Sequence, residues 1–126
     1  MPHFVLEYSD NLAVDADVLQ SLFAGLIDNA VESGLFPLKG MRCRAHPCHD
    51  YRMADGNPEH AFAHLEIKIG VGRSLDERDA FTRSSFDVLK SHLADDIARR
   101  GVALSIELRE LESVTKYNAN NVGDYL

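Results

Sequence analysis

The amino-terminal stretch MPHFVLEY contains the first residue that could do chemistry. Pro2 precedes six residues, His3 to Tyr8, whose composition favours a β-strand. Proline is tolerated as the first residue of a strand, so a structural role alone is one interpretation. The other requires removal of Met1, which leaves Pro2 with a free secondary amine. An α-amino group titrates at about 7.7–8.0, and burial beside apolar groups and cations would lower its pKa towards that of a general base at pH 7.

Three arginines could bind an anionic substrate. Arg42 and Arg44 are two residues apart in a predicted strand and therefore share one face of it. Arg73 lies in Gly70-Val-Gly72-Arg73-Ser74, at a predicted helix start whose backbone amides could also hold an anion. Guanidinium groups bind carboxylates through two parallel hydrogen bonds. The alternative is that these are ordinary solvated or ion-paired surface arginines.

A third segment, Cys43-Arg-Ala-His46-Pro-Cys48-His49, invites a metal interpretation. It lacks the paired C-x₂-C spacing of zinc sites, and strand alternation places Cys43 on the face opposite Arg44 and His46. We therefore expect no metal site, with a metal-binding protein as the weaker alternative.

Composition limits the class of protein. The 126 residues predict one domain, and the formal charge of −7 disfavours binding to nucleic acid or to an anionic membrane. Two cysteines make no disulfide framework, and neither a signal peptide nor an apolar run of about 20 residues is present. The expected location is the cytoplasm.

Hydrophobic periodicity predicts two similar halves, about 2–46 and 61–111. Each half is predicted to consist of a strand, a helix and a strand. In the first half the strands are 3–8 and 40–46, and the helix between them is capped by Asp15 or Asp17 and ends near Gly34. In the second half the strands are 61–69 and 102–111, and the helix begins with the capping box Ser74–Glu77 and ends at Gly101. Right-handed crossovers make each pair of strands parallel. The prediction is an α+β fold with a four-stranded mixed sheet and both helices on one face. The other face lacks a cover, so we expect a homo-oligomer.

Considered together, several segments resemble one family. They are PHFVLEYSDN, GLFPLKGMRCR, MADG, HLEIKIGVGRSL and the late NNV, and they occur in matching order and spacing over essentially the whole chain. The chain is similar to the 5-carboxymethyl-2-hydroxymuconate isomerases of the tautomerase superfamily. This resemblance implies a homotrimer of two-βαβ subunits and catalysis without metal or organic cofactor. It also implies Pro2 as the catalytic residue, with Arg42 and Arg73 beside it.

The resemblance further implies the reaction: an enol tricarboxylate becomes its conjugated 2-oxo isomer, in homoprotocatechuate breakdown. We expect Arg44 to contribute to substrate binding and Phe36, near Arg42, to supply an apolar wall that lowers the pKa of the base. The segment HPCHDYR departs from the family pattern, since Tyr51 is its only aromatic residue. A tautomerase for a different enol acid is therefore one alternative, and a non-catalytic trimeric binding module is another.

Overall fold

A single mixed sheet organises the chain, and the computed structural model describes all residues, 1–126. The strands are β1 (His3–Ser9), β2 (Arg42–Cys48), β3 (Ala61–Ile69) and β4 (Val102–Glu110). Their order is β2-β1-β3-β4, with β1 parallel to β2, β3 parallel to β4, and β1 antiparallel to β3. Two βαβ units therefore meet through their first strands, which confirms the predicted fold class.

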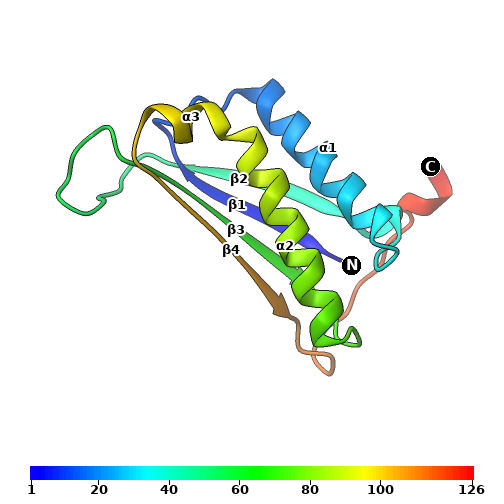
Figure 1. The fold of residues 1–126 in the computed structure, drawn as a ribbon. Helices are drawn as coiled ribbons and strands as arrows, with labels where there is room; N and C mark the ends of the chain where they lie inside the picture. Colours follow the sequence, from blue (N-terminus) through cyan, green and yellow to red (C-terminus); the bar gives the residue numbers. More distant parts are fainter.

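The helices lie on one face of this sheet (Figure 1). They are α1 (Ala16–Glu32), α2 (Leu75–His92) and the short α3 (Ala94–Arg99). Residues of β3 alternate strictly between buried and half-buried, and Leu65, Ile67 and Ile69 are fully buried against the helices. The core therefore fills one side of the sheet, as predicted from the alternation of the sequence.

Local signals in the sequence fix the helix ends. Asp15 caps α1 by accepting the Val18 N–H at 2.9 Å, and Gly34 follows α1 with a φ of +71°. Ser74 and Glu77 form the predicted capping box at the start of α2, with hydrogen bonds of 3.2 and 2.8 Å. These caps satisfy backbone groups that a helix end leaves free.

Two predicted boundaries were wrong. The second strand spans Arg42–Cys48 instead of 40–46, because Leu38–Gly40 form a 3₁₀ turn, η1, and because Pro47 is accommodated in an edge strand. The second helix does not run unbroken to Gly101. It is interrupted at Leu93, whose N–H bonds three residues back to Lys90 O at 3.3 Å and whose side chain is buried.

The polar tail returns to the amino-terminal end of its own chain. Leu111 N–H donates to Ile69 O at 2.7 Å, and a second 3₁₀ turn, η2 (Val122–Tyr125), packs against η1. The close approach is visible in Figure 1, where the red end of the chain lies beside the cyan segment that contains η1. The tail therefore packs on the chain that carries it.

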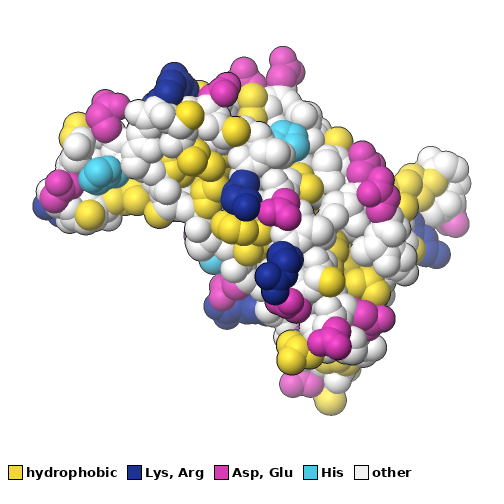
Figure 2. All heavy atoms as spheres, viewed as in Figure 1, with side chains coloured by type: hydrophobic (Ala, Val, Ile, Leu, Met, Phe, Trp, Pro, Cys, Tyr) yellow, Lys and Arg dark blue, Asp and Glu magenta, His cyan; other side chains and the backbone are white.

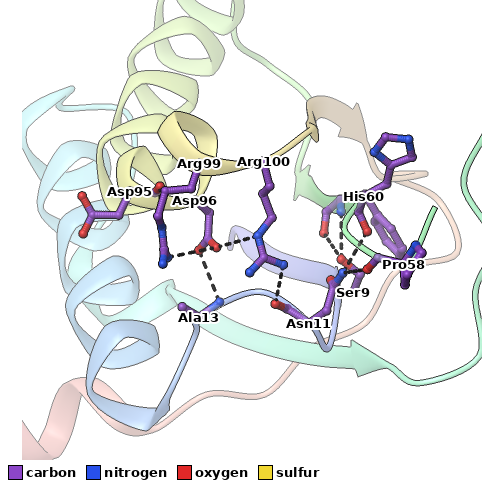
Figure 3. Close-up of polar contacts among 10 residues, drawn as sticks. Ser9, Asn11, Ala13, Pro58, His60, Asp95, Asp96, Arg99 and Arg100 are labelled. Carbon is purple, nitrogen blue, oxygen red and sulfur yellow. Dashed lines mark hydrogen bonds and ion pairs between the residues drawn. The ribbon is translucent and has the colours of Figure 1, made fainter.

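A buried acid fixes α3 against the β1–α1 connection (Figure 3). The Asp96 carboxylate is 3% exposed; it accepts the Ala13 N–H at 3.3 Å and lies 3.4 Å from Arg100 Nε. Arg100 in turn donates to Asn11 O at 2.8 Å, and the Asn11 side chain donates to His60 O at 2.8 Å. This network joins segments that are far apart in the sequence.

We predict that Asp96→Ala lowers the free energy of unfolding by about 2–3 kcal/mol, because it leaves a half-buried guanidinium and a backbone N–H without their partner. Urea unfolding followed by circular dichroism measures the change. Asp95→Ala, next to it on the exposed side of α3, is the control and should change stability by less than about 0.5 kcal/mol. Equal stability of the two variants would contradict this role of Asp96.

Candidate active site

The start of the chain is buried against the beginning of β2. Pro2 is almost fully buried, and its carbonyl accepts the Arg42 N–H at 3.2 Å. Met1 precedes it here, and the Met1 side chain lies over Gly40, where an added Cβ would come within 3.2 Å of Met1 Cγ. The small residue at position 40 thus leaves room beside the amino terminus.

Arg42 and Arg44 extend from β2 on the same side of the sheet, as predicted. Arg42 Nη1 donates to Gly40 O at 3.2 Å and lies 3.5 Å from Met1 Sδ, so this guanidinium is next to the amino terminus. Arg44 is more exposed and contacts His3, with 3.3 Å between Nη1 and Nδ1. Arg42 is therefore the nearer of the two to Pro2.

Arg73 approaches the amino terminus from the β3–α2 connection. It donates to Gly70 O at 3.1 Å and to Leu35 O at 2.8 Å, and its guanidinium lies 4.6 Å from the centre of the Phe36 ring. Phe36 is 4% exposed and packs on Phe81, with 4.9 Å between ring centres. Phe36 thus supports the guanidinium of Arg73.

The tail brings further polar groups that sequence reasoning missed. Lys116 Nζ would lie 3.1 Å from a Cβ added to Gly70, whose carbonyl Arg73 contacts. Asn120 donates from Nδ2 to Lys39 O at 2.7 Å and lies 3.4 Å from Met1 Sδ. The one available signal was that Lys116 is the only basic residue after Arg109.

Most basic side chains of this acidic chain have a carboxylate within 4.0 Å. Those on the helix layer lie beside acidic ones, as with Arg83–Asp79 and Lys90–Asp87 of α2 (Figure 2). The exceptions are Lys39, Arg42, Arg44, Arg52, Arg73 and Lys116. Arg42, Arg73 and Lys116 act on the terminal amine and Arg44 contacts the adjacent His3, and we call these four residues the amino-terminal cation cluster. Positive charge without a protein partner is what an anionic ligand requires.

The cation cluster changes the ionisation of its neighbours. Burial, followed by the charges of Lys116, Arg73 and Arg42, lowers the pKa of the terminal amine, which belongs to Met1 here, below its ordinary value of 8.0. Burial, followed by Arg44 and Arg42, likewise lowers the pKa of His3. Both shifts favour a neutral nitrogen at this end of the sheet.

The Cys43–His49 segment follows the sheet away from Pro2. Cys43 lies on the core side, and burial raises the pKa of its thiol to about 12. His49 pairs with Asp10 at 2.6 Å in a cavity of about 300 Å³ beside Tyr51 and Arg52. No three His, Cys, Asp or Glu side chains come together as a metal would require. In Figure 1 the loop that follows lies at the opposite end of the sheet from the amino terminus.

Comparison with known proteins identifies the family. The family described as 5-carboxymethyl-2-hydroxymuconate isomerase matches residues 2–126. The chain belongs to this family. A curated relative, the 5-carboxymethyl-2-hydroxymuconate Delta-isomerase of Escherichia coli, is 41% identical over 122 residues, covering 97% of this chain and 96% of the relative.

Solved structures agree with this family membership. A 5-carboxymethyl-2-hydroxymuconate isomerase from Deinococcus radiodurans R1 is 36% identical with a TM-score of 0.86, covering 99% of this chain and 94% of that one. A fused 4-OT symmetric trimer shares the fold at 17% identity, with a TM-score of 0.70 over 93% of this chain and 91% of that one. The fold is thus of the tautomerase type. None of the helices combines the length and apolar character of a membrane span.

We predict that the pKa of the terminal amine rises when Arg73 is replaced by Gln, because removing a nearby cation relieves repulsion of the ammonium form. Competitive labelling of the amine as a function of pH measures this shift. Arg83→Gln, on the outer face of α2, is the control and should leave the pKa where the unchanged chain has it. An unchanged pKa of the terminal amine in Arg73→Gln would contradict an electrostatic effect of Arg73 on the terminal nitrogen.

Proposed function

We propose that this protein is an enol–keto isomerase that converts 5-carboxymethyl-2-hydroxymuconate to its conjugated 2-oxo isomer. The main support is one observation: in a chain of net charge −7, four of the six cations without a carboxylate partner, Arg42, Arg44, Arg73 and Lys116, lie around the buried Pro2 or the adjacent His3. Membership of the isomerase family points to the same reaction. Pro2 acts in this proposal as the first residue, after removal of Met1, so that its nitrogen is a secondary amine.

The proposed reaction moves one proton within the substrate. The neutral Pro2 nitrogen accepts the proton of the 2-hydroxyl group, the O–H bond breaks, and a delocalised dienolate forms. The protonated nitrogen then delivers a proton to a carbon atom farther along the conjugated chain, so that a C–H bond forms and the 2-oxo group remains. Atoms and electrons balance without oxidant or reductant, and the base returns to its neutral form.

The arginines stabilise the negative charge in this scheme. The substrate carries three carboxylates and the dienolate adds negative charge on oxygen, in a protein that would otherwise repel anions. Arg42 donates to Gly40 O at 3.2 Å, and Arg73 is held by two backbone carbonyls and the Phe36 ring. Preorganised cations of this kind stabilise a developing oxyanion without having to reorient during the reaction. Arg44, farther out on β2, would contact a distal carboxylate.

We infer that the working unit is a homotrimer of a single tautomerase-like domain, 1–126, with its two halves at about 2–46 and 61–111. Support comes from the sheet face opposite the helices, which has no cover in one chain, and from the fused 4-OT protein, which is a trimer. Homoprotocatechuate breakdown in the cytoplasm is the proposed setting.

We predict that Pro2→Ala lowers kcat at least about 100-fold, because a positioned general base contributes on that scale. Spectrophotometric ketonisation of the hydroxymuconate, on protein whose first residue is verified by intact mass, measures the loss. A chain that keeps Met1 should be similarly inactive, since the Pro2 nitrogen is then an amide. Pro58→Ala is the control. Turnover near that of the unchanged protein in the Pro2→Ala variant would reject Pro2 as the base.

We predict that Arg73→Ala lowers kcat/KM about 10- to 100-fold, mainly by raising KM, because a charge-assisted pair with a carboxylate is lost. Steady-state kinetics gives the two constants, and thermal melting shows whether the loss of the Leu35 contact unfolds the chain. Arg73→Lys keeps the positive charge but not the two parallel hydrogen bonds of a guanidinium, so its kcat/KM should lie between those of Arg73→Ala and the unchanged protein. The control Arg83→Ala removes an equal charge from α2. An unchanged kcat/KM in Arg73→Ala would remove Arg73 from the site.

A further inference from the structure

We propose that the carboxyl-terminal tail forms one wall of the active site, where Lys116 binds a carboxylate of the substrate and Asn120 holds the tail in place. This proposal rests on the proposed function for the identity of the substrate. It assigns to the tail a role in recognition, which its polar and irregular sequence did not predict. Three features of the structure support it.

The first feature is the position of the Lys116 ammonium. It lies over Gly70, where an added Cβ would be 3.1 Å from Nζ, and Gly70 is the residue whose carbonyl accepts from Arg73 at 3.1 Å. Gly70 has no side chain to displace the ammonium, so Lys116 and Arg73 both lie against one buried residue. Lys116 also ranks first among the charges that act on the terminal amine.

The second feature is that Lys116 has no acidic partner. No carboxylate lies within 4.0 Å of Nζ, although the tail itself carries Glu112 and Asp124. The ammonium of Lys116 is repelled by the nearby arginines, and no protein carboxylate offsets this repulsion. Its ammonium is therefore available to an anion that arrives between it and the arginines.

The third feature is the attachment of the tail. The Asn120 amide donates to Lys39 O at 2.7 Å, and its carbonyl accepts the Val122 N–H at 3.0 Å. Behind it Gly123 packs so closely that an added Cβ would be 2.9 Å from Lys39 Cδ. Asn120 thus fixes the tail to η1, four residues after Lys116. We assign it the role of a positioning residue.

The charges fit the ligand. Three cations act on the terminal amine, Arg42, Arg73 and Lys116, and the proposed substrate has three carboxylates. The first two come from the sheet and the start of α2, whereas Lys116 comes from an irregular segment. Lys116 is accordingly the cation that would discriminate a tricarboxylate from smaller enol acids.

The experiment compares Lys116→Ala with the unchanged protein, both with Pro2 as the first residue. We expect KM for the tricarboxylate to rise about 10-fold with kcat within about threefold, because binding loses one charge-assisted pair. Lys116→Arg should restore most of the affinity, and about 0.5 M salt should narrow the difference. Lys90→Ala, which removes an equal charge from α2, is the control.

A second measurement separates this proposal from the isomerase activity. Calorimetric binding of propane-1,2,3-tricarboxylate, a stable probe with three carboxylates, should weaken about 10-fold in Lys116→Ala. If the unchanged protein binds the probe through Lys116 but does not ketonise the hydroxymuconate, the proposed function fails and the tail site stands. If Lys116→Ala binds the probe and the substrate as the unchanged protein does, the tail site is overturned. Absence of probe binding in the unchanged protein also overturns it.

The role of Asn120 has its own readout. Asn120→Ala should raise KM as Lys116→Ala does, and the double variant should be no worse than either single one, because both act through the same ammonium. Asn118→Ala, in the same tail without a hydrogen bond of its own, is the control. A lower melting temperature of Asn120→Ala with unchanged KM would mean that this residue serves stability alone.

Discussion

Unpaired positive charge surrounds the buried amino terminus of this acidic protein, and the proposed chemistry requires it. Over the helices, basic side chains are neutralised by neighbouring acids, as Arg83 is by Asp79 at 2.7 Å. Around Pro2 the amino-terminal cation cluster has no such neighbours, and burial adds to its effect on the terminal nitrogen. Mutual repulsion among these cations costs free energy, and no carboxylate of the protein offsets that cost. The arrangement is understandable if an anion completes it.

The fold assembles this cluster from separate parts of the chain. Parallel pairing of β1 with β2 sets His3 opposite Arg42, so the chain start and the first arginine share one end of the sheet. Antiparallel pairing of β1 with β3 places Lys68, near the end of β3, opposite His3. The loop that carries Arg73 follows β3 and therefore begins at the same end of the sheet. The tail then closes on η1 through Asn120, which also reaches Met1. Residues so far apart in the sequence can meet because the chain entropy lost in closing a loop grows only slowly with its length.

Much of this could be predicted from the sequence because it depends on local chemistry. The alternation in β3 and the Ser74–Glu77 capping box are signals contained within a few residues, and both were predicted; Asp15 was one of two predicted caps for α1. The wrong boundaries arose where tertiary packing decided the outcome. The helix is interrupted at Leu93, where the Leu93 side chain is buried and Asp96 contacts Ala13. The hydrophobic periodicity of the sequence does not indicate either contact. Resemblance to a family pointed to Pro2, Arg42 and Arg73, but Lys116 became visible only when the tail was placed in space.

A crystal structure of the protein with Pro2 as its first residue, bound to propane-1,2,3-tricarboxylate, tests the role of the cation cluster most directly. We expect the anion to lie among Arg42, Arg73 and Lys116, with at least one carboxylate oxygen within hydrogen-bond distance of the Pro2 nitrogen. An anion bound elsewhere, or a Pro2 nitrogen that faces away from these cations into solvent, would contradict that role.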